Sequence, residues 1–336
     1  MSMEYLPIPT YAFPVLSFLL TGVILFTLIR RYSHRVLDHP NERSLHDRPV
    51  PRTGGIGVVI GIASTVPFVS PTDWWPLWLG AAVLVGTSFV DDVLGVPVLV
   101  RLTVHFLVAG IFMSMLSPVQ PDLSWWLIAA ITVVAIVWMI NLYNFMDGMD
   151  GLAGGMAVFG FGFLGVAAWL NGNVSIALVS ASIASAAGAF LIYNFYPARI
   201  FLGDAGSTTL GFLAAGMAVI GWREDAWSLW FPVVVFSPFI MDATMTLLNR
   251  ILRGERFWLA HRSHCYQRLV LSGWGQRETA FAEYVVMCFC GLTALAYQRT
   301  SEPHGIVFLL LWFAACILLI RAVGKVQVQQ FPNRPL

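Results

Sequence analysis

The feature that most constrains this chain is a succession of apolar runs, each about as long as a bilayer core is thick. About 20 apolar residues in a helix span that core. Such runs cover almost all of the 336 residues, and charged residues make up only 11% of the chain, against roughly 25% in soluble domains. We therefore expect an all-α, polytopic integral membrane protein with a single domain over residues 1–336.

Eleven candidate membrane spans can be placed along the sequence. They lie at about 11–29, 54–70, 74–90, 101–118, 125–143, 153–170, 174–194, 205–222, 228–248, 280–297 and 305–323. The first span does not resemble a cleaved signal peptide, because Glu4 precedes it and no Lys or Arg does, whereas such a signal begins with a basic region.

The placement of Lys and Arg orients these spans. If the N-terminus lies outside, all of the 19 basic residues except Arg223 and Arg299 fall in cytoplasmic segments, as the positive-inside rule requires. The C-terminus is then cytoplasmic. Part of this basic face serves orientation alone, and part suits anionic lipid head groups or an anionic substrate such as a nucleotide.

Within this topology, four polar motifs share the cytoplasmic side. The first is the pair Asp91 and Asp92 at the end of the third span, where adjacent carboxylates repel unless a cation or a proton relieves them. The second is a polar stripe at three-residue spacing that follows the fifth span, namely Asn141, Asn144, Asp147 and Asp150. Carboxylates at membrane depth are costly and usually functional.

The third motif runs from Asn194 to Ser207, where one span ends and a new helix begins near Ala205. Asp204 therefore lies close to a helix N-terminus, which favours phosphate. A carboxylate there suits a Mg²⁺ ion that bridges phosphate oxygens. A plain N-cap by Asp204 is the structural alternative, and the two roles are compatible.

The fourth motif is the basic loop His261–Leu269. His and Arg at this density suit the phosphates or hydroxyls of a sugar nucleotide, and a solvated basic loop is the alternative. Asp242 lies in the ninth span, after Ser237 and Pro238. We expect it either to support the site or to cap a kink at the proline.

At these residues the chain resembles the polyprenyl-phosphate N-acetylhexosamine-1-phosphate transferases, the MraY and WecA family. The resemblance covers about residues 38–270, including Asp38–His46 and Pro49–Gly55. It implies that undecaprenyl phosphate attacks the β-phosphate of a UDP-N-acetylhexosamine and releases UMP. It also implies Mg²⁺ or Mn²⁺ as cofactor and a cytoplasmic-facing site in the bacterial inner membrane. Such phosphoryl transfer needs mainly positioning and charge neutralisation.

The resemblance also implies roles for individual residues. Asp204 is the metal ligand, and Asp150 is left as a structural residue. The catalytic residues are Asp91, Asp92, Asp147 and His264. The substrate-binding residues are Arg52, Asn144, Asn194, Arg262 and Arg268. Because a lipid phosphate is already anionic near pH 7, direct attack is favoured over a covalent enzyme intermediate.

Two departures from the family pattern narrow the expected donor. Many members have His-x-His-His where residues 264–267 read His-Cys-Tyr-Gln. MraY-type enzymes carry lysines after the aspartate pair, whereas residues 93–95 read Val-Leu-Gly and only Arg101 is near. The second departure argues against the peptidoglycan enzyme, and the loop looks more like WbpL-type transferases that initiate O-antigen synthesis. UDP-N-acetyl-fucosamine, -quinovosamine and -glucosamine stay open as donors.

Two other classes of function compete with this interpretation. An ion-coupled transporter predicts carboxylates near the bilayer midplane and inverted repeats, but the acidic motifs gather at one interface and no repeat is visible. A structural scaffold leaves Asp91, Asp92, Asp147 and Asp204 without a purpose. The expected partners are the two substrates and membrane lipids, with no nucleic acid, and a homodimer is left open.

Overall fold

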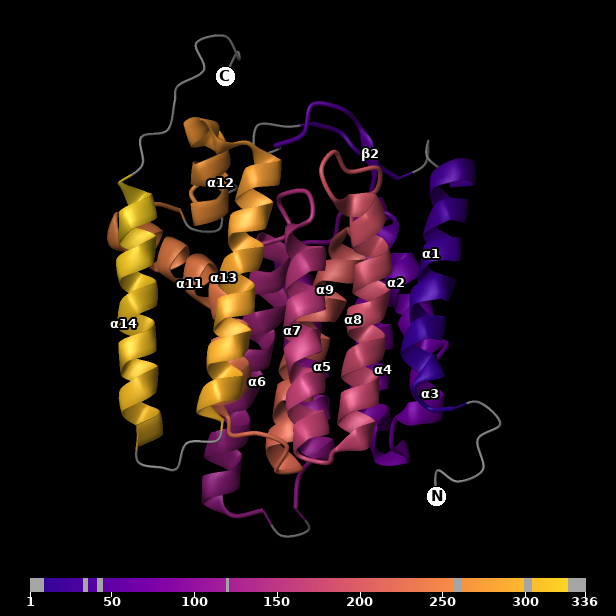
Figure 1. Ribbon diagram of the computed structural model, residues 1–336, viewed down its shortest axis with the longest axis vertical. Helices are drawn as coiled ribbons and strands as arrows, with labels where there is room; N and C mark the ends of the chain where they lie inside the picture. The colour runs from indigo at the N-terminus through magenta and orange to yellow at the C-terminus, as the bar shows by residue number, and fades with distance from the viewer. Residues whose placement is uncertain are drawn as a thin grey trace.

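The computed structural model describes residues 9–32, 36–40, 45–118, 121–256, 261–298 and 304–325. Within these ranges, nine helices are long and apolar enough to cross a membrane. They are α1 (Ala12–Tyr32), α4 (Trp75–Leu94), α5 (Val98–Met115), α6 (Leu123–Phe145), α7 (Leu152–Leu170), α8 (Val174–Asn194), α9 (Asp204–Arg223), α13 (Gln276–Tyr297) and α14 (His304–Gly324). They form one bundle (Figure 1), which confirms the all-α, polytopic class.

The other two predicted spans are broken helices. Residues 54–70 form α2 (Gly54–Ala63) and the single turn α3 (Val66–Val69), while residues 228–248 form α10 (Trp230–Val235) and the start of α11 (Ser237–Leu252). Both second segments have a proline in their first turn, and proline cannot donate the hydrogen bond that would continue a preceding helix. Eleven crossings therefore stay a prediction, since α11 also runs obliquely to the long helices (Figure 1).

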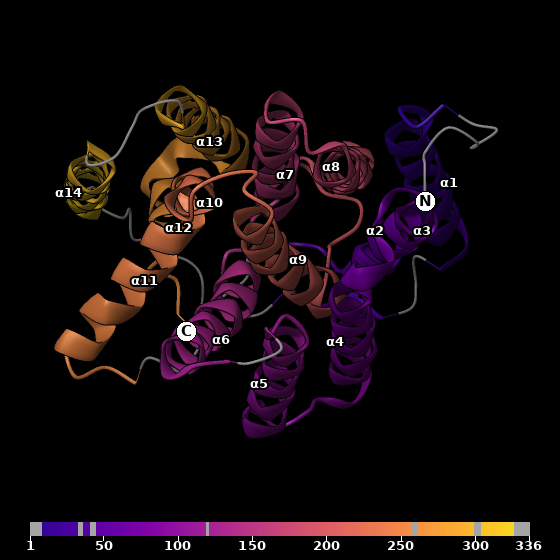
Figure 2. The same ribbon diagram turned by 90° about the horizontal axis from the view of Figure 1, so that it is seen from below.

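Helix α9 lies at the centre of the bundle, against α4 and α6 (Figure 2). Glycines permit this close packing, as is common between membrane helices. A Cβ at Gly211 would lie 2.7 Å from the carbonyl oxygen of Met139, and one at Gly55 would collide with the backbone of Gly206. The N-termini of α2 and α9 therefore meet backbone to backbone.

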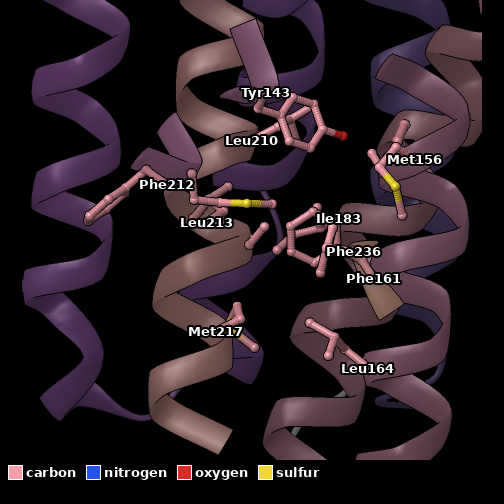
Figure 3. Packing of buried hydrophobic residues seen from close by; sticks show 14 of the residues in the cluster. Tyr143, Met156, Phe161, Leu164, Ile183, Leu210, Phe212, Leu213, Met217 and Phe236 are labelled. Carbon is pink, nitrogen blue, oxygen red and sulfur yellow. The ribbon is translucent and has the colours of Figure 1, made fainter. Parts of the chain in front are cut away.

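Below this contact the core is filled by large apolar side chains (Figure 3). Phe212 of α9 packs edge-on against Phe112 of α5, and Tyr143 of α6 against Phe239 of α11, with ring centroids 5.7 and 5.1 Å apart. These ring contacts join α9 to α5 and α6 to α11 in the core.

The helix ends that carry the polar motifs meet at one face, the upper one in Figure 1. This face also holds α12 (Cys265–Leu269), a π-helical turn (Val270–Trp274) and a hairpin of β1 (Leu37–Asp38) and β2 (Val50–Pro51). A 3₁₀ turn (Thr72–Trp74) precedes α4 on the opposite face.

Helix α1 begins on the face away from the polar motifs and α14 ends on the face that carries them (Figure 1). This agrees with termini on opposite sides of a membrane, although which face is cytoplasmic stays a prediction. Four of the basic residues used to orient the chain lie outside the described residues, namely Arg35, Arg43, Arg299 and Arg334.

Candidate active site

A cavity of about 840 Å³ opens on the face that carries the polar motifs. Eight of the ten predicted site residues line it, and they come from distant parts of the chain. They are Arg52, Asp91, Asp92, Asn144, Asp147, Asn194, Asp204 and His264. The described lining does not include the other two, Arg262 and Arg268. The fold thus brings the motifs together, while the role of each residue stays a prediction.

Arg52, which follows β2, joins the carboxylates at the ends of two helices. Its Nη2 lies 3.1 Å from Asp204 Oδ1 and 3.2 Å from Asp92 Oδ1, and its Nη1 lies 3.9 Å from Asp38 Oδ1. Burial lowers the pKa of the Arg52 guanidinium, but Asp92, Asp204 and Asp38 outweigh it and raise that pKa above its usual value. The side chain is therefore a permanent cation in the acidic cluster.

Arg101 of α5 is a second cation in the site, and the sequence alone assigned it no role. Its Nη1 lies 2.7 Å from Asp91 Oδ2 and 3.5 Å from Asp204 Oδ2. The other oxygen of Asp91 accepts a hydrogen bond from the N–H of Val96 at 2.6 Å. The adjacent carboxylates of α4 thus pair with different arginines, Asp91 with Arg101 and Asp92 with Arg52, and this relieves their mutual repulsion.

The N-terminus of α9 is capped by a carboxylate from another helix. Asp92 accepts hydrogen bonds from the N–H groups of Asp204 and Ala205. Asp204 makes no side-chain cap of its own and instead faces Arg52 and Arg101. The plain N-cap that was one alternative for Asp204 is therefore not what the structure contains, and its carboxylate faces the cavity.

Gly203 makes this approach possible. Its φ of +73° lies in the left-handed region, and a Cβ there would crowd the carbonyl oxygen of Arg52 and Asp92 Oδ2. Since only glycine adopts this conformation without strain, the segment that leads into α9 can pass close under Arg52.

The polar stripe, which begins in the last turns of α6 and continues into the loop after it, divides between the cavity and the loops. Asn144 Nδ2 donates to Ser207 Oγ at 2.9 Å, which ties the stripe to α9. Asp147 is half-buried and close enough to Asp204 for their charges to interact. Burial first, and then Asp204, raises the pKa of Asp147 well above its usual range. Asp147 is thus the member of the stripe that belongs electrostatically to the acidic cluster.

The last acid of the stripe has a structural position. Asp150 is buried, and its Oδ2 accepts a hydrogen bond from the N–H of Ala198 at 2.8 Å. Burial raises the pKa of its carboxyl group. This contact fastens the loop before α7 to the loop before α9, as expected of a structural residue.

Asn194, at the end of α8, uses both ends of its amide on backbone groups. Its Oδ1 accepts from the N–H of Gly151 at 2.9 Å, and its Nδ2 donates to the carbonyl oxygen of Ile200 at 3.0 Å. Only 3% of the residue is exposed. The structure therefore gives Asn194 a loop-fixing position, and its substrate contact stays a prediction.

The basic loop places two histidines on the cavity. The rings of His261 and His264 lie 4.9 Å apart, and both residues line the cavity. Burial, with smaller contributions from His264 and Arg250, lowers the pKa of His261 to about 4. This geometry favours aligning the family's His-x-His-His pattern with residues 261–264, where Ser263 replaces one histidine. Aligned with residues 264–267 instead, the pattern would lack two histidines.

Arg268 faces away from the cavity. Its Nη2 donates to the carbonyl oxygen of Gly324 at 2.6 Å, at the end of α14. The substrate contacts expected of Arg268 and Arg262 stay predictions, and the geometry gives Arg268 a partner on another helix.

Four further residues line the cavity that the sequence assigned no role: Asp38, His46, His105 and Gln276. His46 Nε2 lies 3.2 Å from Asp38 Oδ2, and Gln276 donates to the carbonyl oxygen of Leu45 at 2.8 Å. The segment after β1 is thus fastened over the cavity, although residues 41–44 of the quoted motif lie outside the described part. His105 could have been found from the sequence, because an ionisable side chain inside an apolar run is usually functional.

The donor atoms of the cluster suit a hard cation. Carboxylates prefer Mg²⁺ or Mn²⁺, and Mg²⁺ is usually held by one or two carboxylates together with substrate phosphates. Among the described residues, no three His, Cys, Asp or Glu side chains form a ready-made metal site. Asp204, with Asp147 nearby, therefore fits such a cation only if the phosphates of a substrate supply the remaining oxygens.

Comparison with known proteins matches residues 74–222, from the start of α4 to the end of α9, to the family described as Glycosyl transferase family 4. A probable undecaprenyl-phosphate N-acetylglucosaminyl 1-phosphate transferase of Bacillus subtilis (strain 168) is 28% identical, over 93% of this chain and 92% of its own. The undecaprenyl-phosphate alpha-N-acetylglucosaminyl 1-phosphate transferase of Escherichia coli (strain K12) is 27% identical, over 78% and 76%. A phospho-N-acetylmuramoyl-pentapeptide-transferase of Halalkalibacterium halodurans is 25% identical, over 51% of each chain.

Proposed function

Because the chain belongs to the polyprenyl-phosphate N-acetylhexosamine-1-phosphate transferase family, we propose that it transfers a HexNAc-1-phosphate from a UDP-N-acetylhexosamine to undecaprenyl phosphate. The products are undecaprenyl-diphospho-HexNAc and UMP. One observation carries the proposal: the carboxylates of Asp91, Asp92 and Asp204 converge with the guanidinium groups of Arg52 and Arg101 in one cavity.

The lining of the cavity supports a lipid acceptor. Away from the charged cluster, apolar side chains of α5 and α6 form its walls, namely Val98, Leu102, Phe106, Val134, Val137 and Trp138. An acceptor with a phosphate head and an isoprenoid chain needs charged and apolar surfaces side by side. A water-soluble acceptor would have no use for the apolar wall, because burying a polar group there costs free energy.

The reaction follows from the charges in the cavity. An oxygen of the lipid phosphate attacks the β-phosphorus of the donor, the bond from that phosphorus to the bridging oxygen breaks, and UMP leaves with the electron pair. No base is needed for an anionic phosphate. Arg52 and Arg101 are placed to bind phosphate oxygens in exchange for part of their contacts with the carboxylates.

The remaining roles are assigned by position. Asp204, with Asp147 beside it, would hold Mg²⁺ or Mn²⁺, which when bound neutralises charge on the diphosphate. Asp91 and Asp92 keep the two arginines oriented. Asn144 lies next to the N-terminus of α9, where a nucleotide phosphate is favoured.

We assign the protein to the bacterial inner membrane, with the cavity facing the cytoplasm, where a UDP-sugar is available. The one-sided placement of basic residues supports this orientation. For the donor, the relatives are named for N-acetylglucosamine, while Ser263 in the basic loop supports a variant sugar of the kind used to begin O-antigen. A homodimer stays a prediction.

The ion-coupled transporter is the second candidate, and the geometry favours it less. Its coupling carboxylates would lie in the middle of the bundle, whereas the acids of this cavity lie at helix ends and are paired with arginines. A carboxylate neutralised by a fixed guanidinium is a poor site for a transported cation.

The test is an assay of the purified protein with undecaprenyl phosphate, Mg²⁺ and a panel of UDP-HexNAc donors. We expect UMP release together with a lipid-linked sugar for at least one donor, and none after chelation. Absence of a lipid-linked product with every donor, in a preparation that is monodisperse and binds lipid, would overturn the proposal.

A further inference from the structure

Asp242 of α11 is a buried carboxylate for which the proposed chemistry has no use. Only 5% of the residue is exposed. The N–H of Cys265 donates to both of its oxygens, at 2.9 and 3.0 Å, and the hydroxyl of Thr246 donates to Oδ1 at 3.0 Å. The carboxylate thus joins α11 to the first turn of α12, in the basic loop.

His264 connects this carboxylate to the cavity. Its Nδ1 lies 3.4 Å from Asp242 Oδ1, and within the described part of the chain this buried nitrogen has no hydrogen-bond partner. The separation is long for a hydrogen bond, but such bonds in unliganded sites often tighten when the substrate binds. Because Nδ1 faces Asp242 and His264 lines the cavity, Nε2 is the ring nitrogen available to a ligand.

The neighbouring histidine differs in its surroundings. The Nδ1 of His261 lies 2.9 Å from the hydroxyl of Ser263, and its lowered pKa of about 4 keeps it neutral near pH 7. The ring of His264 instead stacks on Tyr266, with centroids 5.8 Å apart, and faces a carboxylate. A second acid, Glu283 of α13, lies close enough to Asp242 for their charges to interact. Of the two rings, that of His264 is therefore the one whose Nδ1 faces a carboxylate.

We propose that Asp242 is a positioning residue that acts through His264, an inference that rests on the proposed function. A carboxylate accepts hydrogen bonds, so the nitrogen that faces it carries a hydrogen. The ring is then held with Nε2 directed into the cavity, where it accepts a hydrogen bond from a hydroxyl or amide group of the donor sugar. Carboxylate–histidine pairs of this kind fix the orientation of the ring.

A double-mutant cycle tests the proposal with Asp242→Asn, His264→Gln and the double variant. We expect each single variant to lower kcat/KM for the UDP-HexNAc roughly 10- to 100-fold, the usual loss when a supporting partner of a histidine is removed. The double variant should be no worse than His264→Gln within about 2-fold, because Asp242 has no other route to the substrate. KM for undecaprenyl phosphate should not change.

Losses that multiply in the double variant would overturn the proposal, since they would mean that Asp242 only caps α12. Thr246→Val is the matched control, because it removes a hydrogen bond to the same carboxylate and keeps the charge. We expect it to retain activity within about 3-fold. If Asp242→Asn fails to fold, Asp242→Glu keeps a carboxylate and enters the same cycle, with the same two outcomes.

The affinity for UDP-N-acetylglucosamine, measured by calorimetry on the full-length protein and its variants, is a second readout of the double-mutant cycle. If the wild type binds this nucleotide but transfers no sugar, the proposed function fails while the binding cycle still decides the role of Asp242. If the wild type transfers sugar and the two losses multiply, the proposed function stands and the inference on Asp242 fails. A wild type that neither binds nor transfers any UDP-HexNAc overturns both.

Discussion

At two corners of the cavity, a carboxylate from one helix caps the N-terminus of another. In the corner of α4 and α9, Asp92 caps the N-terminus of α9, and in the corner of α11 and α12, Asp242 caps the N-terminus of α12. In each case the capping carboxylate also faces a nitrogen of another side chain, Arg52 in the first and His264 in the second.

The difference lies in what is capped. Helix α9 has 20 residues and lies at the centre of the bundle, whereas α12 has five residues and is held by Asp242 of α11, by the end of α6 and by contacts with α13 and α14. A rigid corner built from long helices suits the charges that perform the transfer. A corner built from a short helix between connecting segments suits recognition, because such segments vary in sequence more readily than long helices.

Among the variants that test this difference between the corners, Asp204→Asn should lose the most activity. Removing the charge that would hold the cation costs several kcal/mol of transition-state stabilisation, about 10³-fold or more in kcat. Turnover with and without added Mg²⁺ measures it, and normal yield and melting temperature in detergent serve as the control. Near-normal activity would remove Asp204 from the catalytic corner.

Arg52→Lys should have the next largest effect. Lysine keeps the charge but has one nitrogen, whereas Arg52 uses Nη2 for Asp92 and Asp204 and Nη1 for Asp38. We therefore expect a loss of about 10- to 100-fold in kcat. Arg268→Lys is the matched control in the other corner. Equal losses for the two variants would contradict the division between a catalytic and a recognition corner.

A smaller effect on activity, together with a clear one on stability, is expected for Asn194→Ala. The substitution leaves the N–H of Gly151 and the carbonyl of Ile200 without their partners, at about 1–3 kcal/mol for each buried group. The melting temperature should fall while KM for the donor changes by less than about 3-fold. A large rise in KM at unchanged stability would restore Asn194 to the substrate-binding set.

The smallest effect is expected for Arg268→Gln. The guanidinium donates to the end of α14 and does not line the described cavity, so kcat/KM should stay within about 3-fold of the wild type. Steady-state kinetics with varied UDP-HexNAc measures this. A loss comparable to that of His264→Gln would show that the whole loop turns toward the donor when it binds.

Much of the helical framework could be predicted from local pattern. Each of the eleven predicted spans coincides with helix in the structure, because the length of an apolar run and the width of a bilayer are matched. The sequence offered a kink at Pro238 as one alternative but gave no expectation of the break at Pro67. A proline also reveals neither where the chain goes next nor that α11 runs obliquely.

The candidate site was predictable as a set of motifs and less so as a set of contacts. Asp91, Asp92, Asp147 and Asp204 were expected to share a face, and they line one cavity. The pairing of Arg101 with Asp91, the position of His261 beside the predicted His264, and the direction of Arg268 were not expected. Each depends on a neighbour from a separate helix or on the path of a loop, and spacing along the chain encodes neither.

The sequence by itself determined the class, the helices and the side on which the chemistry collects, because these follow from apolar length, charge placement and short motifs. Only the tertiary structure decided which carboxylate faces which arginine or histidine side chain. Arg52 and Asp204 are 152 residues apart in sequence and 3.1 Å apart in space, and Asp92 rather than Asp204 caps α9. Such choices depend on how closely the glycines of α2 and α9 let two backbones approach, which is a property of the packed bundle.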